Sequence, residues 1–205
     1  MWRQYLRSRR LHLAVIGWFV TVAASAWWGD HAVVIPSFGL GVREMVLAVL
    51  VLPLPAVAGA LATLDNDMAM WERHAWRRVY WWDLGVVTTC LGAYVAGLAL
   101  GIGDVGGVPS IAILGAVWWM ALGLVSAVVL GRRLAWAVPV VAMLAMLWFG
   151  RPSRPLWWAV PFHEVTVPKA LLAVTVYLAA AGFYLWAAHR PVTRGTRWWG
   201  IASQS

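Results

Sequence analysis

Residues 108–130 read VPSIAILGAVWWMALGLVSAVVL, a run without a single charged side chain. A membrane-spanning helix needs about 20 mostly apolar residues to cross a hydrocarbon core roughly 30 Å thick. A helix of this length that is apolar on every side is typical of a membrane span or of the core of a large protein. The run therefore predicts a membrane-spanning helix.

Further uncharged stretches lie on both sides of this run, at residues 11–28, 45–64, 84–103, 134–149 and 170–188. Together with residues 108–130 they predict an all-α, polytopic integral membrane protein with six transmembrane helices in a single transmembrane domain, 1–205. Pro53 and Pro55 lie in the second stretch and Pro139 lies in the fifth. Because proline interrupts helix hydrogen bonding, we expect these two helices to be bent or broken.

The composition excludes several other classes of protein. Of the 205 residues, 62% are apolar and 12% are charged. Soluble domains are about 45–50% apolar and about 25% charged, so this chain has too little polar surface to be a soluble globular protein. Intrinsic disorder requires low hydrophobicity, and a disulfide framework requires more cysteines than the single Cys90.

The basic residues indicate the orientation of the spans. If the N-terminus is cytoplasmic, only Arg43, Arg151, Arg154 and Lys169 of the 16 Lys and Arg fall in outer segments. Such a bias predicts that both termini are inside, in a multi-pass protein of the cell (plasma) membrane, which we expect to be bacterial. The net charge of +8 is then an orientation signal, and no nucleic-acid partner is expected.

The first span has a second interpretation. Basic residues, an apolar run and Ala24-Ser25-Ala26 also describe a cleavable signal peptide. Trp27 and Trp28 directly after that site favour a retained helix with an interfacial anchor. Cleavage of the first span is therefore left open.

The predicted spans contain none of the eight acidic or 16 basic residues. Ion-coupled transporters and voltage sensors keep ionisable groups at depth, so energy is not expected to enter through these helices. Polar residues within the spans, such as Thr88, Ser126 and Thr175, either bond to a carbonyl one turn back or to a neighbouring helix, or line a substrate path. Gly97 and Gly101 form a GxxxG surface for packing inside the chain or against a second copy.

Local motifs for catalysis and metal binding are missing from the sequence. It contains no GxxxxGK[ST] phosphate-binding loop, and the GxGxxG at 101–106 joins two predicted membrane helices. No histidine lies three or four residues from another histidine or from the cysteine, so no metal site is expected. We therefore expect this chain not to be an enzyme and to hold no cofactor.

Three segments outside the spans have recognisable patterns. Residues 1–10 combine Trp2, Tyr5 and Leu6 with an arginine stripe, which fits an interfacial helix or a simple positive flank. Residues 65–83, DNDMAMWERHAWRRVYWWD, predict an amphipathic cytoplasmic helix that lies on lipid or docks into a partner protein. Residues 150–168, GRPSRPLWWAVPFHEVTVP, are apolar but broken by prolines, as in an outer re-entrant segment or a stiff loop with aromatic anchors.

This layout resembles the transmembrane subunit, or permease, of an ABC transporter of the ABC-2 exporter type. The resemblance covers the whole chain and rests on the order of the segments, with 1–10 as connecting helix and 65–83 as coupling helix. It implies an ABC-type ATPase subunit that binds ATP and magnesium, and a second permease copy, identical or not. The residues expected to dock the ATPase are Asp67, Glu72, Arg73, Arg77 and Arg78.

The resemblance also implies an apolar or amphipathic cargo, such as a lipid, a hydrophobic peptide or an antibiotic. Trp18, Trp118 and Trp119 fall near mid-depth, away from the interfaces that tryptophan prefers, and are candidates for the substrate path or for packing. Trp157, Trp158 and Phe162 would form an outer gate, and membrane lipids would surround the spans. Two other classes stay open, a stand-alone six-helix ligand-binding or immunity protein and an accessory subunit of a larger membrane complex.

Overall fold

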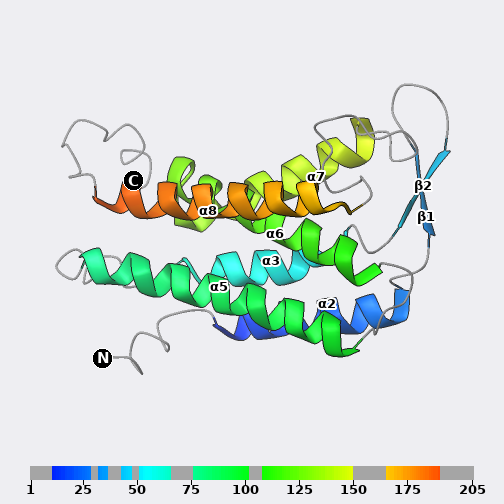
Figure 1. Ribbon diagram of the computed structural model, residues 1–205, viewed down its shortest axis with the longest axis horizontal. Helices are drawn as coiled ribbons and strands as arrows, with labels where there is room; N and C mark the ends of the chain where they lie inside the picture. The colour runs from blue at the N-terminus through cyan, green and yellow to red at the C-terminus, as the bar shows by residue number, and fades with distance from the viewer. Residues whose placement is uncertain are drawn as a thin grey trace, which may run out of the picture.

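A computed structural model of the chain describes residues 11–28, 32–36, 43–47, 51–65, 76–101, 108–149 and 165–189. The helices are α2 (Leu11–Trp28), α3 (Pro53–Ala62), α5 (Trp76–Gly101), α6 (Val108–Val129), α7 (Ala137–Phe149), α8 (Val167–His189) and the short 3-10 helix η2 (Arg132–Leu134). Strands β1 (Ala32–Pro36) and β2 (Arg43–Leu47) pair antiparallel, with Ala32 opposite Leu47 and Pro36 opposite Arg43. The helices lie side by side in an elongated bundle, and the hairpin lies at one end of it (Figure 1).

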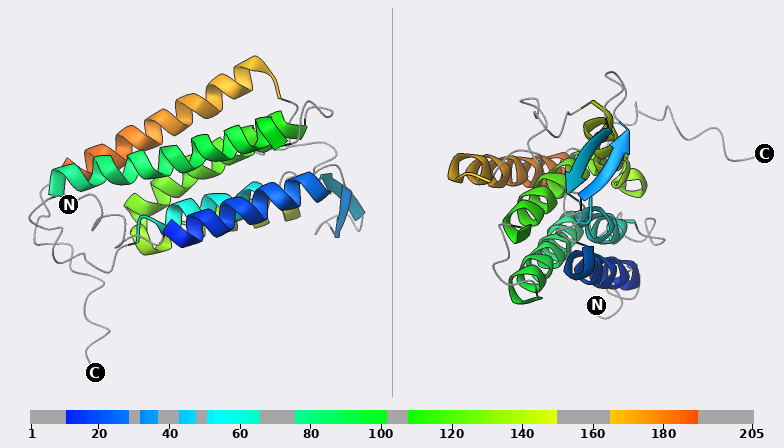
Figure 2. Two further views of the ribbon diagram at one scale, coloured as in Figure 1. Left: turned by 90° about the horizontal axis from the view of Figure 1, so that it is seen from below. Right: turned by 90° about the vertical axis from the view of Figure 1, so that its right-hand side faces the viewer.

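The helix ends form two groups at opposite ends of the bundle. Helices α2 and α5 begin, and α6 and α8 end, at the end far from the hairpin (Figures 1 and 2). The ends of α2 and α5 and the beginnings of α6 and α8 lie nearer the hairpin. We call these the distal end and the hairpin end of the bundle.

Three segments among the described residues are long and apolar enough to cross a membrane: Ser110–Val129, Arg132–Phe149 and Val167–Ala187. Two shorter apolar helices are Leu11–Ala24 and Pro53–Ala62. The chain is therefore a helical protein with at least three membrane-length apolar segments, and the full set of six spans stays a prediction. The all-α prediction holds for the bundle, whereas the β-hairpin was not predicted.

The predicted helix at residues 45–64 is wrong in its first part. Strand β2 extends to Leu47, and α3 begins only at Pro53. Proline lacks an N–H and clashes with the preceding helical turn, so it is well tolerated only in the first turn. The expected break at Pro53 and Pro55 is confirmed, and Pro139 likewise lies in the first turn of α7.

The start of α3 lies against α2. A helix normally leaves four N–H groups without a partner in its first turn. Here Pro53 and Pro55 have no N–H, Leu54 donates to the carbonyl of Val51 at 3.1 Å, and the Ala56 N–H donates to Thr21 Oγ1 at 3.0 Å. The N–H groups of residues 53–56 are therefore either absent or hydrogen-bonded.

Helices α2 and α3 run antiparallel with their backbones in contact. A side chain at Gly17 would collide with the carbonyl oxygen of Pro55, and one at Gly59 would lie 2.6 Å from the carbonyl oxygen of Leu13. The two close approaches are four residues apart on both helices, one turn each. Glycine at both positions removes the Cβ that would push the helices apart.

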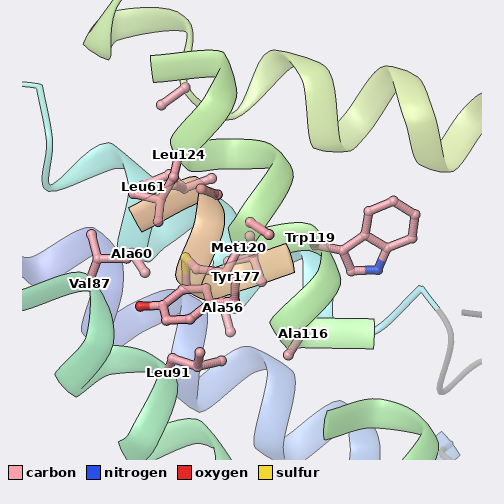
Figure 3. Packing of buried hydrophobic residues seen from close by; sticks show 14 of the residues in the cluster. Ala56, Ala60, Leu61, Val87, Leu91, Ala116, Trp119, Met120, Leu124 and Tyr177 are labelled. Atoms are coloured by element: carbon pink, nitrogen blue, oxygen red, sulfur yellow. The ribbon is translucent and has the colours of Figure 1, made fainter. Parts of the chain in front are cut away.

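Helix α6 forms the centre of the bundle. Of its membrane-length segment, Ser110–Val129, 61% is buried, compared with 22% of Arg132–Phe149 and 28% of Val167–Ala187. Helix α6 also contacts α3, α5, α7 and α8. Leu61 of α3, Leu98 of α5 and Leu124 of α6 are among the fully buried side chains of the core. Figure 3 shows part of this cluster at the junction of α3, α5, α6 and α8.

Helix α5 differs from the prediction at its start. It runs for 26 residues from Trp76 to Gly101, so the expected boundary between the coupling segment and the third span at Asp83 is not a helix boundary. The second part of the 65–83 segment is continuous with the apolar helix. Residues 66–75, the first part, lie outside the described residues.

Candidate functional site

A buried ion pair joins three elements at the distal end of the bundle. Asp83, on α5, is only 1% exposed, and its Oδ2 lies 3.0 Å from Nη2 of Arg132 on η2. The hydroxyl of Tyr184, on α8, donates to the same carboxylate oxygen at 3.3 Å. Asp83 is the charged residue that the structure buries most completely among those described.

Aromatic rings complete this site. The guanidinium carbon of Arg132 lies 4.3 Å from the centre of the Tyr80 ring, within the range of a cation–π interaction. The rings of Tyr80 and Tyr184 are 5.4 Å apart between centroids. Tyr80 is one turn before Asp83 on α5, so both residues face the same neighbours. We call Tyr80, Asp83, Arg132 and Tyr184 the Asp83 cluster.

The backbone around η2 directs Arg132 toward Asp83. Gly131, just before it, has φ +92° and ψ 159°, a conformation that only glycine adopts easily. The hydroxyl of Ser126, buried at the end of α6, donates to the carbonyl of Leu134 at 2.8 Å across the turn. The turn between α6 and α7 is thereby held from both sides, which fixes the position of Arg132.

The energetics favour keeping this ion pair intact. A buried carboxylate without a counterion costs several kcal/mol, and removing one partner of a buried pair destabilises a protein by about 3–5 kcal/mol. Ionisable residues within membrane proteins are rare for the same reason and usually have a function. The Asp83 cluster therefore links α5, the α6–α7 turn and α8 into one unit at the distal end.

The Asp83 cluster was missed at the sequence level. Asp83 is the last residue of the 65–83 segment and is assigned no role from the sequence alone. Its partners Arg132 and Tyr184 lie far along the chain, and only the fold brings them together. One feature of the sequence could have indicated that Asp83 is buried. Tyr80 and Asp83 have helical spacing, and the helix face that they share continues into the following apolar helix.

The predicted docking residues are only partly described. Asp67, Glu72 and Arg73 lie outside the described residues. Arg77 and Arg78 lie in the first turn of α5, at the distal end, one turn before Tyr80. The predicted outer-gate residues Trp157, Trp158 and Phe162, and most of the 150–168 segment, also lie outside the described residues, and α8 begins at Val167.

The predicted path residues Trp18, Trp118 and Trp119 are all described and share one property. The indole Nε1 atom of each is buried and has no hydrogen-bond partner among the residues that the structure describes. Trp18, on α2, packs against Gly97 of α5, where an added Cβ would lie 2.8 Å from the indole Cζ2. The GxxxG stripe thus makes an internal contact at Gly97.

Most hydroxyls in the helices follow the predicted packing pattern. Thr88, Thr89 and Thr175 donate to the carbonyl one turn back, at 2.7–2.8 Å. Thr88 also bonds to the hydroxyl of Tyr177 on α8 at 2.7 Å, which links α5 to α8. The prediction of carbonyl and interhelical bonds is confirmed for these residues.

The described residues contain no group of three or more His, Cys, Asp or Glu side chains that could hold a metal ion. No protein family, curated protein or solved structure matches the chain. The functional conclusion therefore rests on the Asp83 cluster, the buried indoles and the arrangement of the helices.

Proposed function

We propose that this chain is the membrane-spanning subunit of an ATP-driven transporter of the ABC type, which exports a lipid, a hydrophobic peptide or an antibiotic across the cell membrane. ATP and magnesium would bind to a separate ATPase subunit, and a second permease copy would complete the path. The observation that carries this proposal is the continuity of the coupling segment with α5, combined with the Asp83 cluster.

This arrangement suits the conversion of docking into helix movement. A helix moves as a rigid element because its backbone is bonded from turn to turn, so a displacement of its first turn is passed along its length. An ATPase bound near Arg77 and Arg78 would displace the start of α5. Through Asp83, the displacement would reach Arg132 in the α6–α7 turn and Tyr184 on α8.

The electrostatics of the bundle support an external energy source. Asp83, the buried charged residue of the described part of the chain, has Arg132 as its counterion. That carboxylate is bonded to both Arg132 and Tyr184 and so holds three elements together. Energy supplied by a partner subunit at the distal end does not require a proton or a sodium ion to pass through the helices.

The outer faces of the bundle support a membrane environment. Large apolar side chains are exposed along α2, α7 and α8, including Phe19, Val141, Leu171 and Leu178. Exposed apolar surface in a protein commonly marks contact with a membrane or with another protein. These faces would contact acyl chains or a second permease copy.

The docking step can be tested by photocrosslinking in the native host. A photoreactive amino acid replaces Glu72, the protein is irradiated in cells, and captured partners are identified by mass spectrometry. We expect an ATPase with a phosphate-binding loop, and we expect the double variant Arg77→Glu with Arg78→Glu to abolish both capture and export. The matched control is Arg133→Glu, a charge reversal at an exposed arginine of the same end.

Capture that persists in the double variant, or function that survives it, would contradict the proposal. A stand-alone ligand-binding or immunity protein is the second candidate, favoured by three buried indoles that have no acceptor among the described residues. It predicts that the purified chain binds its ligand with no ATPase present and that the Arg77 and Arg78 reversals have no effect.

A further inference from the structure

The strongly exposed tryptophans of the described residues lie toward the two ends of the bundle. Trp27 and Trp148 are the next-to-last residues of α2 and α7, and both helices end toward the hairpin (Figure 1). Four more tryptophans lie toward the distal end and are 45–59% exposed: Trp81, Trp82, Trp136 and Trp186. By contrast, Trp18, Trp118 and Trp119, which lie near the middle of α2 and α6, have buried indole nitrogens.

The Asp83 cluster holds the four distal tryptophans at one level of the bundle. Trp81 and Trp82 directly precede Asp83 on α5. In the α6–α7 turn and on α8, the exposed tryptophan follows Arg132 by four residues and Tyr184 by two. At 1.5–2.0 Å per residue, each of them lies within about 8 Å of the cluster along its own element. We call Trp81, Trp82, Trp136 and Trp186 the distal belt.

The helices that run from the distal belt toward the hairpin have the length of a membrane core. From Trp82 to Gly101, α5 rises about 28 Å, and α8 rises by the same amount between Val167 and Trp186. The hydrocarbon core of a bilayer is roughly 30 Å thick. Along this length the helices expose large apolar side chains, such as Val15, Phe19, Val141, Leu144 and Leu178.

The chemistry of indole favours the boundary of a bilayer over water or hydrocarbon. The ring is apolar, whereas its N–H is a hydrogen-bond donor. Tryptophan is therefore enriched at the level where the acyl chains meet the glycerol and headgroup oxygens of the lipids. The distal belt draws its members from α5, the α6–α7 turn and α8, so it follows a level of the bundle on three elements.

We propose that the distal belt binds the glycerol and headgroup region of the phospholipid bilayer and sets the depth of the bundle in the membrane. The Asp83 cluster then lies at the level of the headgroups, and the first turn of α5, with Arg77 and Arg78, extends past them into water. This placement goes beyond the proposed function and does not depend on an ATPase.

The depth of three positions on α5 tests the placement in the full-length protein, reconstituted into liposomes of phosphatidylcholine and phosphatidylglycerol. A nitroxide is attached to Arg78→Cys, Gly85→Cys or Gly92→Cys in a Cys90→Ser background. Gly85 and Gly92 have nothing within 4 Å of an added Cβ, so a label fits at both. Power saturation in electron paramagnetic resonance then compares collisions with oxygen, which concentrates in the bilayer, and with a nickel chelate, which stays in water.

We expect the Arg78 label to collide mainly with the chelate and the Gly92 label mainly with oxygen. The Gly85 label, about one turn past the belt, should lie about 10 Å shallower than the Gly92 label. Equal access of the chelate to the Arg78 and Gly85 labels would place the belt in water, as a surface for a protein partner. Equal depths of the Gly85 and Gly92 labels would place it inside the hydrocarbon core. Either result would overturn the proposal.

A matched pair of variants tests whether the indoles set this depth. Replacing all four belt tryptophans by leucine removes the polar N–H groups, so the Gly85 label should move deeper and show a higher ratio of oxygen to nickel collisions. Replacing them by tyrosine keeps amphipathic rings and should leave the ratio unchanged. The four side chains are exposed, so the core is the same in both variants. An unchanged ratio in the leucine variant would show that the belt does not set the depth.

This outcome is separate from the outcome of the docking test. The label depths are measured on the isolated chain, so failure of the Arg77 and Arg78 test would leave the belt intact. A belt found in water or in the core would leave the capture of an ATPase to be decided by photocrosslinking alone.

Discussion

At the scale of single residues, Arg132 and Arg133 are neighbours in sequence with different surroundings. Arg132 is bonded to the buried Asp83 and lies over Tyr80, whereas Arg133 is exposed. We expect Arg132→Ala to lower the unfolding free energy by about 3–5 kcal/mol, because it removes the guanidinium that lies 3.0 Å from the buried Asp83 carboxylate. Thermal unfolding in detergent measures the loss.

The matched change Arg133→Ala removes the same charge at an exposed position and should alter stability by less than about 1 kcal/mol. Equal melting temperatures for the two variants would show that the ion pair contributes nothing. Double replacement of Asp83 and Arg132 by Asn and Met should recover part of the loss, since no uncompensated charge then remains.

The glycines of α5 provide a second comparison between single residues. Gly97 packs on the indole of Trp18, whereas Gly92 has nothing within 4 Å of an added Cβ. Gly92→Ala should stabilise the protein by up to about 1 kcal/mol through helix propensity. Gly97→Ala should lose that gain and destabilise the protein, because the indole must move. The difference between their melting temperatures measures the Trp18 contact, and no difference would exclude it.

At the scale of elements, the first turn of α3 depends on one side chain of α2, whose hydroxyl accepts the buried Ala56 N–H. We expect Thr21→Val to cost about 1–3 kcal/mol, because it leaves the Ala56 N–H buried without an acceptor at nearly unchanged side-chain volume. Thr175→Val serves as the control, since the Thr175 hydroxyl is exposed and bonds only to its own helix. Hydrogen exchange at Ala56, followed by mass spectrometry, should accelerate in the Thr21 variant alone.

The uncharged runs predicted some elements closely and others poorly. The run at residues 108–130 matches α6 to within a residue, because an apolar stretch with clear ends has few alternatives to a helix. The second run was misread because residues 45–47 of strand β2 and the helix α3 are both apolar, and hydrophobicity alone does not separate a strand from a helix. The buried tryptophans were identified from the sequence because they fall near mid-depth of the predicted spans. The burial of Asp83 could not be predicted in this way, because it depends on a partner on another element.

At the scale of the whole molecule, the predicted sidedness can be tested at two positions. The α6–α7 turn with Arg132 and Arg133 lies at the distal end, together with the first turn of α5, and Arg43 lies in the hairpin. We expect a membrane-impermeant maleimide to label Arg43→Cys in intact spheroplasts and Arg133→Cys only after permeabilisation. Both changes are made in a Cys90→Ser background, which removes the native thiol.

Labelling of both positions in intact cells would contradict the orientation with both termini inside. Labelling in the reverse order would invert it and move the proposed docking end to the outer face. The assay is independent of the cargo and of the ATPase.

The contact between α2 and the start of α3 also has a consequence for biosynthesis. Ten residues are too few for a helix to be inserted into a bilayer by its own hydrophobicity. Helix α2 leaves the ribosome first and offers both the Thr21 hydroxyl and the glycine surface that α3 requires. We therefore expect α2 and α3 to enter the membrane as a pair, with α2 acting as the template on which the shorter helix is completed.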